Sequence, residues 1–492
     1  MKIDLLHKPT EYMETVIILQ EENGDIDKVE YLPEYLQNAI NIVVKQDDFH
    51  FKYSSLKSFP FIRSRKRTNI ILCGIGNPKE LDNDRFRNLI AISVREAIKI
   101  EAKEAYLFTG FKNPLSELHF GHMLAEAALL TEYRFNKYLS EPKSSSLQAI
   151  HLAMDLKNPH MFNRGVLEGR IFAEATNLSR DLVNEPANVI YPESLAEVAK
   201  KVALKYGFSI EVFGLDKIKR LKMEAFLAVG KGSKKEPRLI LMSYRGNPDP
   251  KANTIGLIGK GLTYDSGGYC LKNCQGMVNM KNDMSGAAAV IGTMAAITNL
   301  KLKVNVLGIV AACENMISGS AYHAGDIIRS MSGKTIEVVN TDAEGRLTLI
   351  DAIHYAISRE HIDEVIDIAT LTGAAASTFG NQISAVLTNN EALLNKIQSA
   401  SEFSGEKIWQ LPLYEPYKEL ITSEIADLKN TGGPFAGTIT SALFLQEFVA
   451  GKPWIHLDIA GTALRDKEQG IYSYGATGVG VRLLTQLLRE LE

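Results

Sequence analysis

Short runs of apolar residues alternate with amphipathic segments along most of this chain. Runs rich in Val, Ile and Leu are typical of buried strands, whereas apolar positions repeating every three or four residues indicate helices that bury one face. Strands are predicted at 15–19, 69–72, 104–108, 239–242, 254–258, 304–312, 337–339, 364–369 and 454–459, and helices at 86–100, 163–183, 286–298, 348–358 and 438–449. This alternation predicts an α/β protein with a mostly parallel central sheet, whose ligands bind beyond the carboxyl ends of strands.

The predicted elements fall into two groups joined by one long helical stretch. Residues 1–160 are expected to form a smaller N-terminal α/β domain, and residues 187–492 a larger domain that contains the central sheet. The stretch 161–186 is predicted to be a linker helix, because its helical pattern continues until Pro186, which cannot extend a helix.

Composition and charge narrow the class of protein. The chain has 492 residues, 45% of them apolar, and its 58 acidic and 55 basic residues leave a formal charge of −3. This balance excludes a chain-wide basic surface of the kind that binds nucleic acid by releasing counterions. Four scattered cysteines are too few for a disulfide scaffold. The charged first residues and the lack of a long apolar run predict a cytoplasmic protein that does not enter a membrane.

One segment, 63–67, concentrates positive charge as Arg-Ser-Arg-Lys-Arg. We interpret it as a solvated loop ahead of the next strand, because charge runs are usually solvated faces, and nucleic acid is not expected as a partner. Contact with nucleic acid through this segment is the alternative. The glycines of 74–76 cover only part of a dinucleotide-binding fingerprint, and a tight turn between strand and helix explains them without a ligand.

Two glycine-rich stretches near predicted strand ends, 258–284 and 339–347, carry unusual charge. Their acidic residues of interest are Asp265, Asp283, Asp342 and Glu344. Burying four carboxylates is prohibitive unless they lie apart or cations join them. Two divalent ions would balance the four charges, and oxygen-rich ligation suits Mg, Mn or Zn. Each stretch taken alone is equally well explained as a turn, because Asp, Asn, Ser and Gly favour turns.

The second stretch is specific enough to indicate a family. Residues 340–347, Asn-Thr-Asp-Ala-Glu-Gly-Arg-Leu, resemble the hallmark of the leucyl aminopeptidase (cytosolic aminopeptidase) family of dinuclear-metal exopeptidases. Further segments similar to the family's are 179–188, 259–272, 369–373, 436–440 and 456–461. The resemblance covers about residues 165–490, whereas the first 160 residues match only in general character, as a macro-like α/β domain.

The resemblance implies two divalent metal ions per chain, Mn or Zn, with Mg and Co as alternatives. One ion would be held by Lys260, Asp265, Asp283 and Glu344, and the other by Asp265, Asp342 and Glu344, so that Asp265 and Glu344 bridge the two. Lys260 has to lose its proton to act as a ligand, which lysine can do where cations crowd it.

The resemblance also implies a reaction, the release of N-terminal amino acids, leucine among them, from peptides. A water activated by both ions would attack the scissile carbonyl carbon, and the free amine of the substrate would bind one ion. Lys272 would stabilise the oxyanion, and Arg346 would hold a bicarbonate ion that serves as general base. Substrate contacts would come from Lys272, Met280, Asp283, Leu371 and Gly373.

A few residues near these motifs depart from the family's pattern or invite another interpretation. Asn273, Ser285 and Ala324 stand where the family usually has Pro, Gly and Pro, and none is an implied ligand. We expect these three departures to affect the rigidity of their loops and the preference for substrates, but not the catalytic reaction. Cys270 and Cys274 flank Lys272 and are expected to be small buried side chains.

The partners implied by the resemblance are peptides with a free N-terminus and other copies of the chain, in a homohexamer of two trimers. A two-metal phosphatase or nuclease would use similar carboxylates and is the competing function. The octapeptide and the spacing of Lys260 and Lys272 favour the peptidase, and a phosphoesterase assay separates the two.

Overall fold

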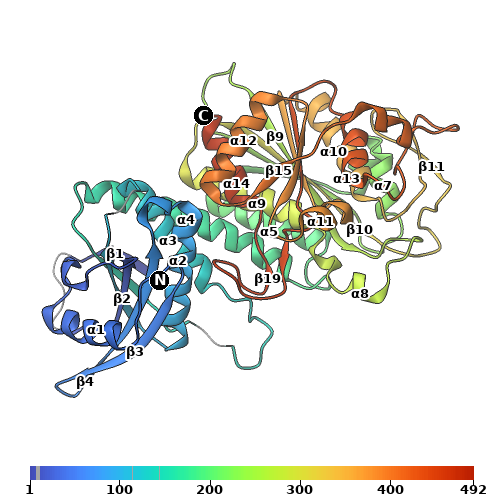
Figure 1. The fold of residues 1–492 in the computed structure, drawn as a ribbon. Coiled ribbons are helices and arrows are strands. Elements are labelled where there is room, and N and C mark those ends of the chain that lie inside the picture. The colour runs from blue at the N-terminus through green and yellow to red at the C-terminus, as the bar shows by residue number, and fades with distance from the viewer. Residues whose placement is uncertain (7–11, 113–114, 143–144) are drawn as a thin grey trace. The chain divides into compact units, whose positions relative to one another are not determined.

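The computed structural model describes residues 1–6, 12–112, 115–142 and 145–492. The chain forms two compact units, one of Met1–Glu174 with Lys467–Ser473 and the other of Ala175–Asp466 with Tyr474–Glu492. The division falls inside one long helix, α4 (Pro159–Asn184). Figure 1 draws most of the first unit in blue and the second in green to red.

The first unit is a six-stranded sheet with helices on both faces. Its strands are β1 (Lys2–Leu5), β2 (Thr15–Glu21), β3 (Leu56–Arg63), β4 (Lys66–Gly76), β5 (Glu104–Gly110) and β6 (Ala149–Ala153), in the order β1-β6-β5-β2-β4-β3. All neighbours are parallel except β3 and β4. Helix α1 (Glu34–Gln46) buries Leu36 and Ile40 against the face that carries Val16 and Ile18, and α2 (Asn83–Lys99) and α3 (Glu117–Glu132) pack together on the opposite face.

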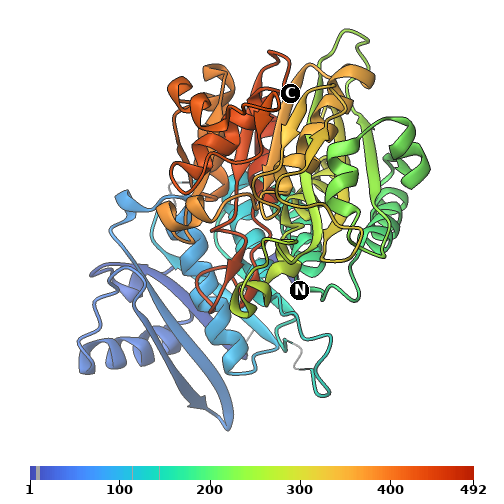
Figure 2. The same cartoon turned by 90° about the vertical axis from the view of Figure 1, so that its right-hand side faces the viewer.

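The basic segment 63–67 is the end of a hairpin. β3 pairs antiparallel with β4 along its whole length, and Ser64 and Arg65 form the turn with φ of 49° and 66°. Positive φ at both positions matches the turn type that suits right-twisted strands. The segment is solvent-exposed as predicted, but only Ser64 and Arg65 form a turn. The strand β3 was not predicted because it is an edge strand without a continuous apolar run, although Phe59 and Phe61 on one of its faces pack against the core. The hairpin is drawn in blue in Figure 1 and Figure 2.

The glycines of 74–76 lie inside β4 and not in a turn. A Cβ on Gly74 would lie 2.3 Å from backbone atoms of Phe51 and Lys52. The predicted strand-to-helix turn was therefore wrong, and the close approach of a neighbouring backbone explains the glycine.

The second unit is built on an eight-stranded sheet. Its strands are β7 (Ser209–Phe213), β8 (Arg238–Arg245), β9 (Thr254–Asp265), β10 (Asn305–Asn315), β13 (Glu364–Ala369), β14 (Ser384–Thr388), β15 (Ile408–Gln410) and β17 (Trp454–Asp458), in the order β15-β14-β17-β13-β9-β10-β8-β7. The central strands β17, β13, β9 and β10 are parallel, whereas β14–β17, β8–β10 and β7–β8 pair antiparallel. The predicted α/β fold with a mostly parallel sheet is confirmed.

Helices cover both faces of this sheet (Figure 1). One face carries α5 (Pro192–Tyr206), α9 (Ser285–Leu300), α12 (Glu391–Ser404) and α14 (Val481–Glu490), and the other carries α7 (Glu224–Gly230), α10 (Gly345–Arg359) and α13 (Gly437–Gln446). Shorter helices are α6 (Leu215–Arg220), α8 (Cys274–Met277) and α11 (Gly373–Phe379). No helix in the part of the chain that the structure describes is long and apolar enough to cross a membrane.

A small sheet of β11 (Ile327–Arg329), β12 (Thr335–Glu337) and β16 (Leu428–Lys429) lies outside the main sheet, as does the pair β18 (Leu464–Arg465) and β19 (Gly475–Ala476). The strand predicted at 337–339 belongs to this small sheet and ends at Glu337. Backbone pairing continues one residue further, since the N–H of Val338 donates to the carbonyl of Asp326 at 2.9 Å. The N–H of Val339 then donates to a side chain, Oδ1 of Asn430, at 2.8 Å.

The parallel strands determine where polar groups can gather. Because β9, β10, β13 and β17 run in one direction, their carboxyl ends meet at one edge of the sheet. The last residues of these strands are Asp265, Asn315, Ala369 and Asp458. The first of the two acidic stretches noted in the sequence, 258–284, reaches this edge of the sheet because β9 ends at Asp265 within it.

Candidate metal centre

Four carboxylates lie at this edge of the sheet. Asp265 is the last residue of β9, and Asp283 follows a short 3-10 turn (Met280–Asn282) directly before α9. Asp342 and Glu344 lie in the connection from β12 to α10, with Glu344 at the start of the helix. Oxygen atoms of Asp265, Asp342 and Glu344 all lie within 4.8 Å of one another. Three elements far apart in the sequence therefore supply one acidic cluster.

Lys260 lies among these carboxylates although it is buried in the middle of β9. Its Nζ donates to Oδ1 of Asp283 at 2.8 Å and to the backbone carbonyl of Thr370 at 2.9 Å, and it lies 2.9 Å from Oε1 of Glu344. A Cβ on Gly345 would lie 2.4 Å from Cε of Lys260. Glycine at position 345 therefore makes room for the lysine.

Lys272 approaches the cluster from the loop after β9. Its Nζ lies 2.7 Å from Oδ2 of Asp265 and also forms an ion pair with Asp342. The side chain is 19% exposed, against 3% for Lys260, so it lies at the open side of the cluster. With all four carboxylates ionised, the cluster would carry excess negative charge, because only two cations face them.

Two buried carboxylate oxygen atoms in the cluster lack hydrogen-bond donors, which bears on whether a cation fits here. Oδ2 of Asp283 and Oε2 of Glu344 accept no hydrogen bond from any residue that the structure describes. Such buried acceptors are costly unless a donor or a cation reaches them. Carboxylate oxygens at this density are ligands that hard and borderline divalent ions prefer. The residues present therefore fit a divalent metal.

Burial and mutual repulsion disfavour the charged form of the carboxylates. Burial, reinforced by Asp265, raises the pKa of Glu344 to about 8 despite the opposing effect of Lys260. Burial likewise raises the pKa of Asp283 to about 6, and Asp265 adds to the effect. Burial would lower the pKa of Lys260, but Asp283, Glu344 and Asp265 outweigh burial and raise that pKa above its ordinary value. Without a divalent ion, Glu344 and Lys260 therefore hold protons that a bound metal would replace.

Arg346 lies in the first turn of α10, close behind Glu344. Its side chain is buried, and Nη1 donates to the backbone carbonyl of Asn430 at 2.8 Å. Burial lowers the pKa of Arg346 to about 10, although Glu344 and Asp458 oppose the shift. Nε of Arg346 has no acceptor among the described residues. This guanidinium can therefore bind an anion beside the carboxylate cluster.

Polar side chains that were not predicted from the sequence hold these loops together. Asn315, at the end of β10, donates from Nδ2 to Oδ1 of Asp265 at 2.9 Å and to the carbonyl of Thr341 at 3.0 Å. The hydroxyl of Tyr322 donates to the same carbonyl at 2.8 Å, and the Thr370 hydroxyl donates to Oδ1 of Asp283 at 2.8 Å. Thr341 and Thr370 lie in segments that are similar to those of the family, and this similarity is the only feature of the sequence that points to these two residues.

Comparison with known proteins places the chain in a family. The model of the cytosol aminopeptidase family catalytic domain matches residues 177–485, and that of the same family's N-terminal domain matches residues 16–142. The chain belongs to the cytosol aminopeptidase family. Membership makes it a metal-dependent aminopeptidase, a hydrolase that acts on peptides, and the carboxylate cluster lies within the matched catalytic domain.

Individual cytosol aminopeptidases match over most of the chain. The probable cytosol aminopeptidase of Clostridium perfringens is 46% identical over 463 residues, which cover 92% of this chain and 93% of the relative. That of Alkaliphilus oremlandii is 45% identical and covers 86% of this chain and 85% of the relative. Among solved structures, the bottromycin maturation enzyme BotP in complex with Mn has a TM-score of 0.85 and 33% identity, covering 97% of this chain and 99% of that one.

Three residues predicted from the sequence to bind substrate lie on the segments that follow β9 and β13. Leu371 follows β13, and its backbone N–H donates to Oδ1 of Asp458 at 3.1 Å. Gly373 is the first residue of α11 and is exposed, and Met280 is half-buried in the 3-10 turn that precedes Asp283. Met280 therefore lies three residues before Asp283 and Leu371 lies beside Asp458, and the role of these residues in substrate binding stays a prediction.

Cys270 and Cys274 are not buried side chains. Cys270 is half-buried and accepts from the backbone N–H of Thr341 at 3.4 Å, whereas Cys274 is exposed at the start of α8. The prediction that both fill the interior was wrong, because the loop around Lys272 lies at the surface. All four cysteines of the chain are free.

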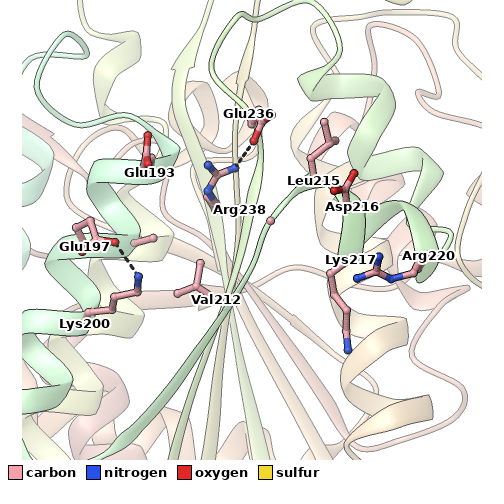
Figure 3. Close-up of a pocket in the computed structure, with 12 residues that line it drawn as sticks. Glu193, Glu197, Lys200, Val212, Leu215, Asp216, Lys217, Arg220, Glu236 and Arg238 are labelled. Atoms are coloured by element: carbon pink, nitrogen blue, oxygen red, sulfur yellow. Dashed lines mark hydrogen bonds and ion pairs between the residues drawn. The ribbon is translucent and has the colours of Figure 1, made fainter.

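A cavity of about 480 Å³ near β7 is a separate feature (Figure 3). Most of the residues that line it are charged, among them residues of α5, α6 and β8, and two ion pairs lie among them. Lys200 lies 2.7 Å from Glu197, and Arg238 lies 3.0 Å from Glu236. None of the carboxylates described above lines this cavity, so its volume adds nothing to the metal centre.

Proposed function

We propose that this chain is a dinuclear aminopeptidase that releases N-terminal residues, leucine among them, from peptides. The observation that supports this most directly is the carboxylate cluster with buried acceptors on Asp283 and Glu344 that lack partners among the described residues. A phosphoesterase with two metals would also need such acceptors. The match of the catalytic-domain model over 177–485 favours the peptidase.

The ligands that we propose are those that the resemblance to the family implies. Lys260, Asp265, Asp283 and Glu344 would hold one divalent ion, and Asp265, Asp342 and Glu344 the other. Manganese and zinc are the first candidates for this mixed nitrogen and oxygen set, with Mg and Co as alternatives. Two ions so held supply a nucleophilic water at neutral pH and polarise the scissile carbonyl.

Lys272 and Arg346 would carry out the remaining chemistry. The ammonium group of Lys272 lies at the open side of the cluster, where it can donate to an oxygen that becomes negative during attack. Arg346 would bind bicarbonate through its planar guanidinium, a geometry that lysine does not reproduce. Bicarbonate so held would accept the proton that the attacking water loses.

Substrate selection would depend on the residues predicted to bind substrate. Met280 and Leu371 offer apolar surface for the first side chain of the peptide, and the exposed Gly373 leaves space beside it. The free amine of the substrate would bind one of the two ions beside Asp283, which restricts the reaction to chain ends. We further propose a cytoplasmic homohexamer of two trimers, with residues 1–160 and 187–492 as its domains and 161–186 as the linker helix.

An activity panel tests the proposal. Metal-free protein is reconstituted with Mn²⁺, Zn²⁺, Mg²⁺ or Co²⁺ and assayed with aminoacyl p-nitroanilides, with N-acetylated leucine p-nitroanilide, and with p-nitrophenyl phosphate. We expect metal-dependent release from the free aminoacyl substrates only, and loss of that activity in Glu344→Gln. Phosphatase activity without peptidase activity would replace this proposal, and full activity after chelation would overturn the metal centre.

A further inference from the structure

Asn430 connects the loop that carries Asp342 with the guanidinium of Arg346. It directly follows β16, and its side chain is fully buried. Oδ1 accepts from the backbone N–H of Val339 at 2.8 Å and from that of Asn340 at 3.2 Å. Nδ2 donates to the carbonyl of Asn340 at 2.6 Å and to that of Ala343 at 3.4 Å. Both lone-pair positions and both N–H bonds of the amide are therefore used.

These bonds hold one turn at both of its ends. The backbone N–H of Ala343 donates to the carbonyl of Asn340 at 3.2 Å, which closes a four-residue turn with Asp342 at its third position. Asn430 donates to the carbonyls of the first and the last residue of that turn. The orientation of the Asp342 carboxylate therefore depends on a side chain that is remote in sequence.

The backbone of Asn430 acts on a second group. Its carbonyl accepts from Nη1 of Arg346 at 2.8 Å, and its N–H donates to the carbonyl of Glu337 at 3.0 Å. The Asn430 side chain thus fixes the turn before Glu344, while its main chain fixes the arginine after Glu344. One residue sets the relative placement of both.

We propose that Asn430 is a positioning residue for the dinuclear centre. By holding the 340–343 turn and Arg346 in one arrangement, it keeps Asp342 and Glu344 preorganised for metal. Side chains that orient metal ligands typically change metal affinity by about 10–100-fold when they are removed. This inference rests on the proposed function, because it assigns Asp342 as a metal ligand and Arg346 as the anion site.

Two substitutions separate positioning from general stability. Asn430→Asp keeps the shape and the two accepting bonds but turns a carboxylate oxygen toward two carbonyls. Asn430→Ser removes most of the amide contacts and is the second variant if the first does not fold. Asn305→Asp is the matched control, because Asn305 is also buried and accepts from Asn247 N–H at 3.2 Å, but it lies at the opposite end of β10.

The experiment measures three quantities on each full-length variant: the melting midpoint of the metal-free protein, the Mn²⁺ affinity, and kcat and KM with leucine p-nitroanilide. For the Asn430 variants we expect the Mn²⁺ affinity to fall about 10–100-fold. We also expect kcat, measured at saturating Mn²⁺, to fall by at least the same factor, while KM changes little. Asn305→Asp should move the melting midpoint alone.

The inference is overturned if both Asn430 variants fold, bind Mn²⁺ within about twofold of the parent and keep kcat, since Asn430 would then only stabilise the fold. A parent protein without peptidase activity would instead refute the proposed function. The Mn²⁺ titration would still decide whether Asn430 positions a metal ligand, so the two failures are distinguishable.

Discussion

The Nζ of Lys260 lies 2.9 Å from Oε1 of Glu344, although one residue lies within a strand and the other begins a helix. The same Nζ lies 2.8 Å from Asp283. In the metal-free protein the ammonium group thus neutralises carboxylates that would otherwise bind metal. A metal ion can use the nitrogen of Lys260 only after the proton has left, so protonation and metal binding compete at this position.

This competition predicts that metal binding releases protons. Carboxylates raise the pKa of Lys260, and burial raises those of Glu344 to about 8 and Asp283 to about 6. At pH 7 the metal-free site therefore holds protons that Mn²⁺ displaces, and apparent affinity should increase with pH. Calorimetric titrations in buffers of different ionisation enthalpy count the protons. Lys260→Met should release about one proton fewer, and equal release in both proteins would contradict the argument.

Lys272→Met should lower kcat without emptying the metal centre. Removal of one preorganised donor to a developing oxyanion typically costs about 10²–10³-fold in kcat. Lys272 is not a proposed ligand, so Mn²⁺ content should stay near that of the parent while KM changes little. Steady-state kinetics and metal analysis of the same sample measure both. Lys272→Arg, which keeps the charge, should retain more activity than Lys272→Met, and loss of metal in either variant would argue for a different role.

Gly345→Ala should displace Lys260. The new Cβ would lie 2.4 Å from Cε and 2.7 Å from Nζ of the lysine, which has no free space to move into because it is buried. We expect Mn²⁺ affinity and kcat to fall while the protein remains folded by circular dichroism. Gly214→Ala is the control, since nothing lies within 4 Å of its Cβ position and its φ is −85°. Normal metal affinity in Gly345→Ala would show that the lysine adapts.

Asp351 should make stability depend on pH. It is fully buried in α10, where Oδ2 accepts from Phe226 N–H at 2.9 Å and Oδ1 from Met331 N–H at 2.7 Å, yet burial raises its pKa to about 7. Because the folded pKa lies above the unfolded value near 4, the protonated carboxyl stabilises the fold at low pH. That contribution, up to about 4 kcal/mol, is lost as pH rises to about 7.

The measurement compares the parent with Asp351→Asn in urea unfolding at pH 4.5, 6 and 7.5, both in the presence of a chelator. The free energy of unfolding of the parent should decline relative to the variant across this range. If the free energies of unfolding of the parent and the variant changed with pH in parallel, Asp351 would be ionised in the folded protein throughout this range.

Strongly apolar segments of the second unit were predictable from the sequence because their burial comes from local composition. The run at 254–258 is the start of β9, and 304–312 is most of β10. β9 continues to Asp265, beyond the prediction, because Lys260 interrupts the apolar run with a charge that only the site tolerates. β3 was missed for a related reason: it is an edge strand whose inward-facing Phe59 and Phe61 are only half-buried and alternate with exposed positions, so it has no continuous apolar run.

The candidate ligands were identifiable from the sequence because they lie in short motifs with fixed spacing. Asn315 and Asn430 were not, since each is a single polar residue whose partners, Asp265 and the 340–343 turn, are distant along the chain. No local pattern records which backbone groups a buried amide will satisfy. That information exists only after the strands have packed.

The sequence by itself determined the α/β class, the family and the residue types available for metal binding, because these depend on periodicity and on a motif that is contiguous in the chain. Tertiary structure decided which oxygens of Asp283 and Glu344 are left without partners, where Lys260 and Lys272 place their charges, and how Asn430 holds the turn before Arg346. The physical reason is that burial and hydrogen-bond partners at this site come from parallel strands whose carboxyl ends meet only in the folded sheet.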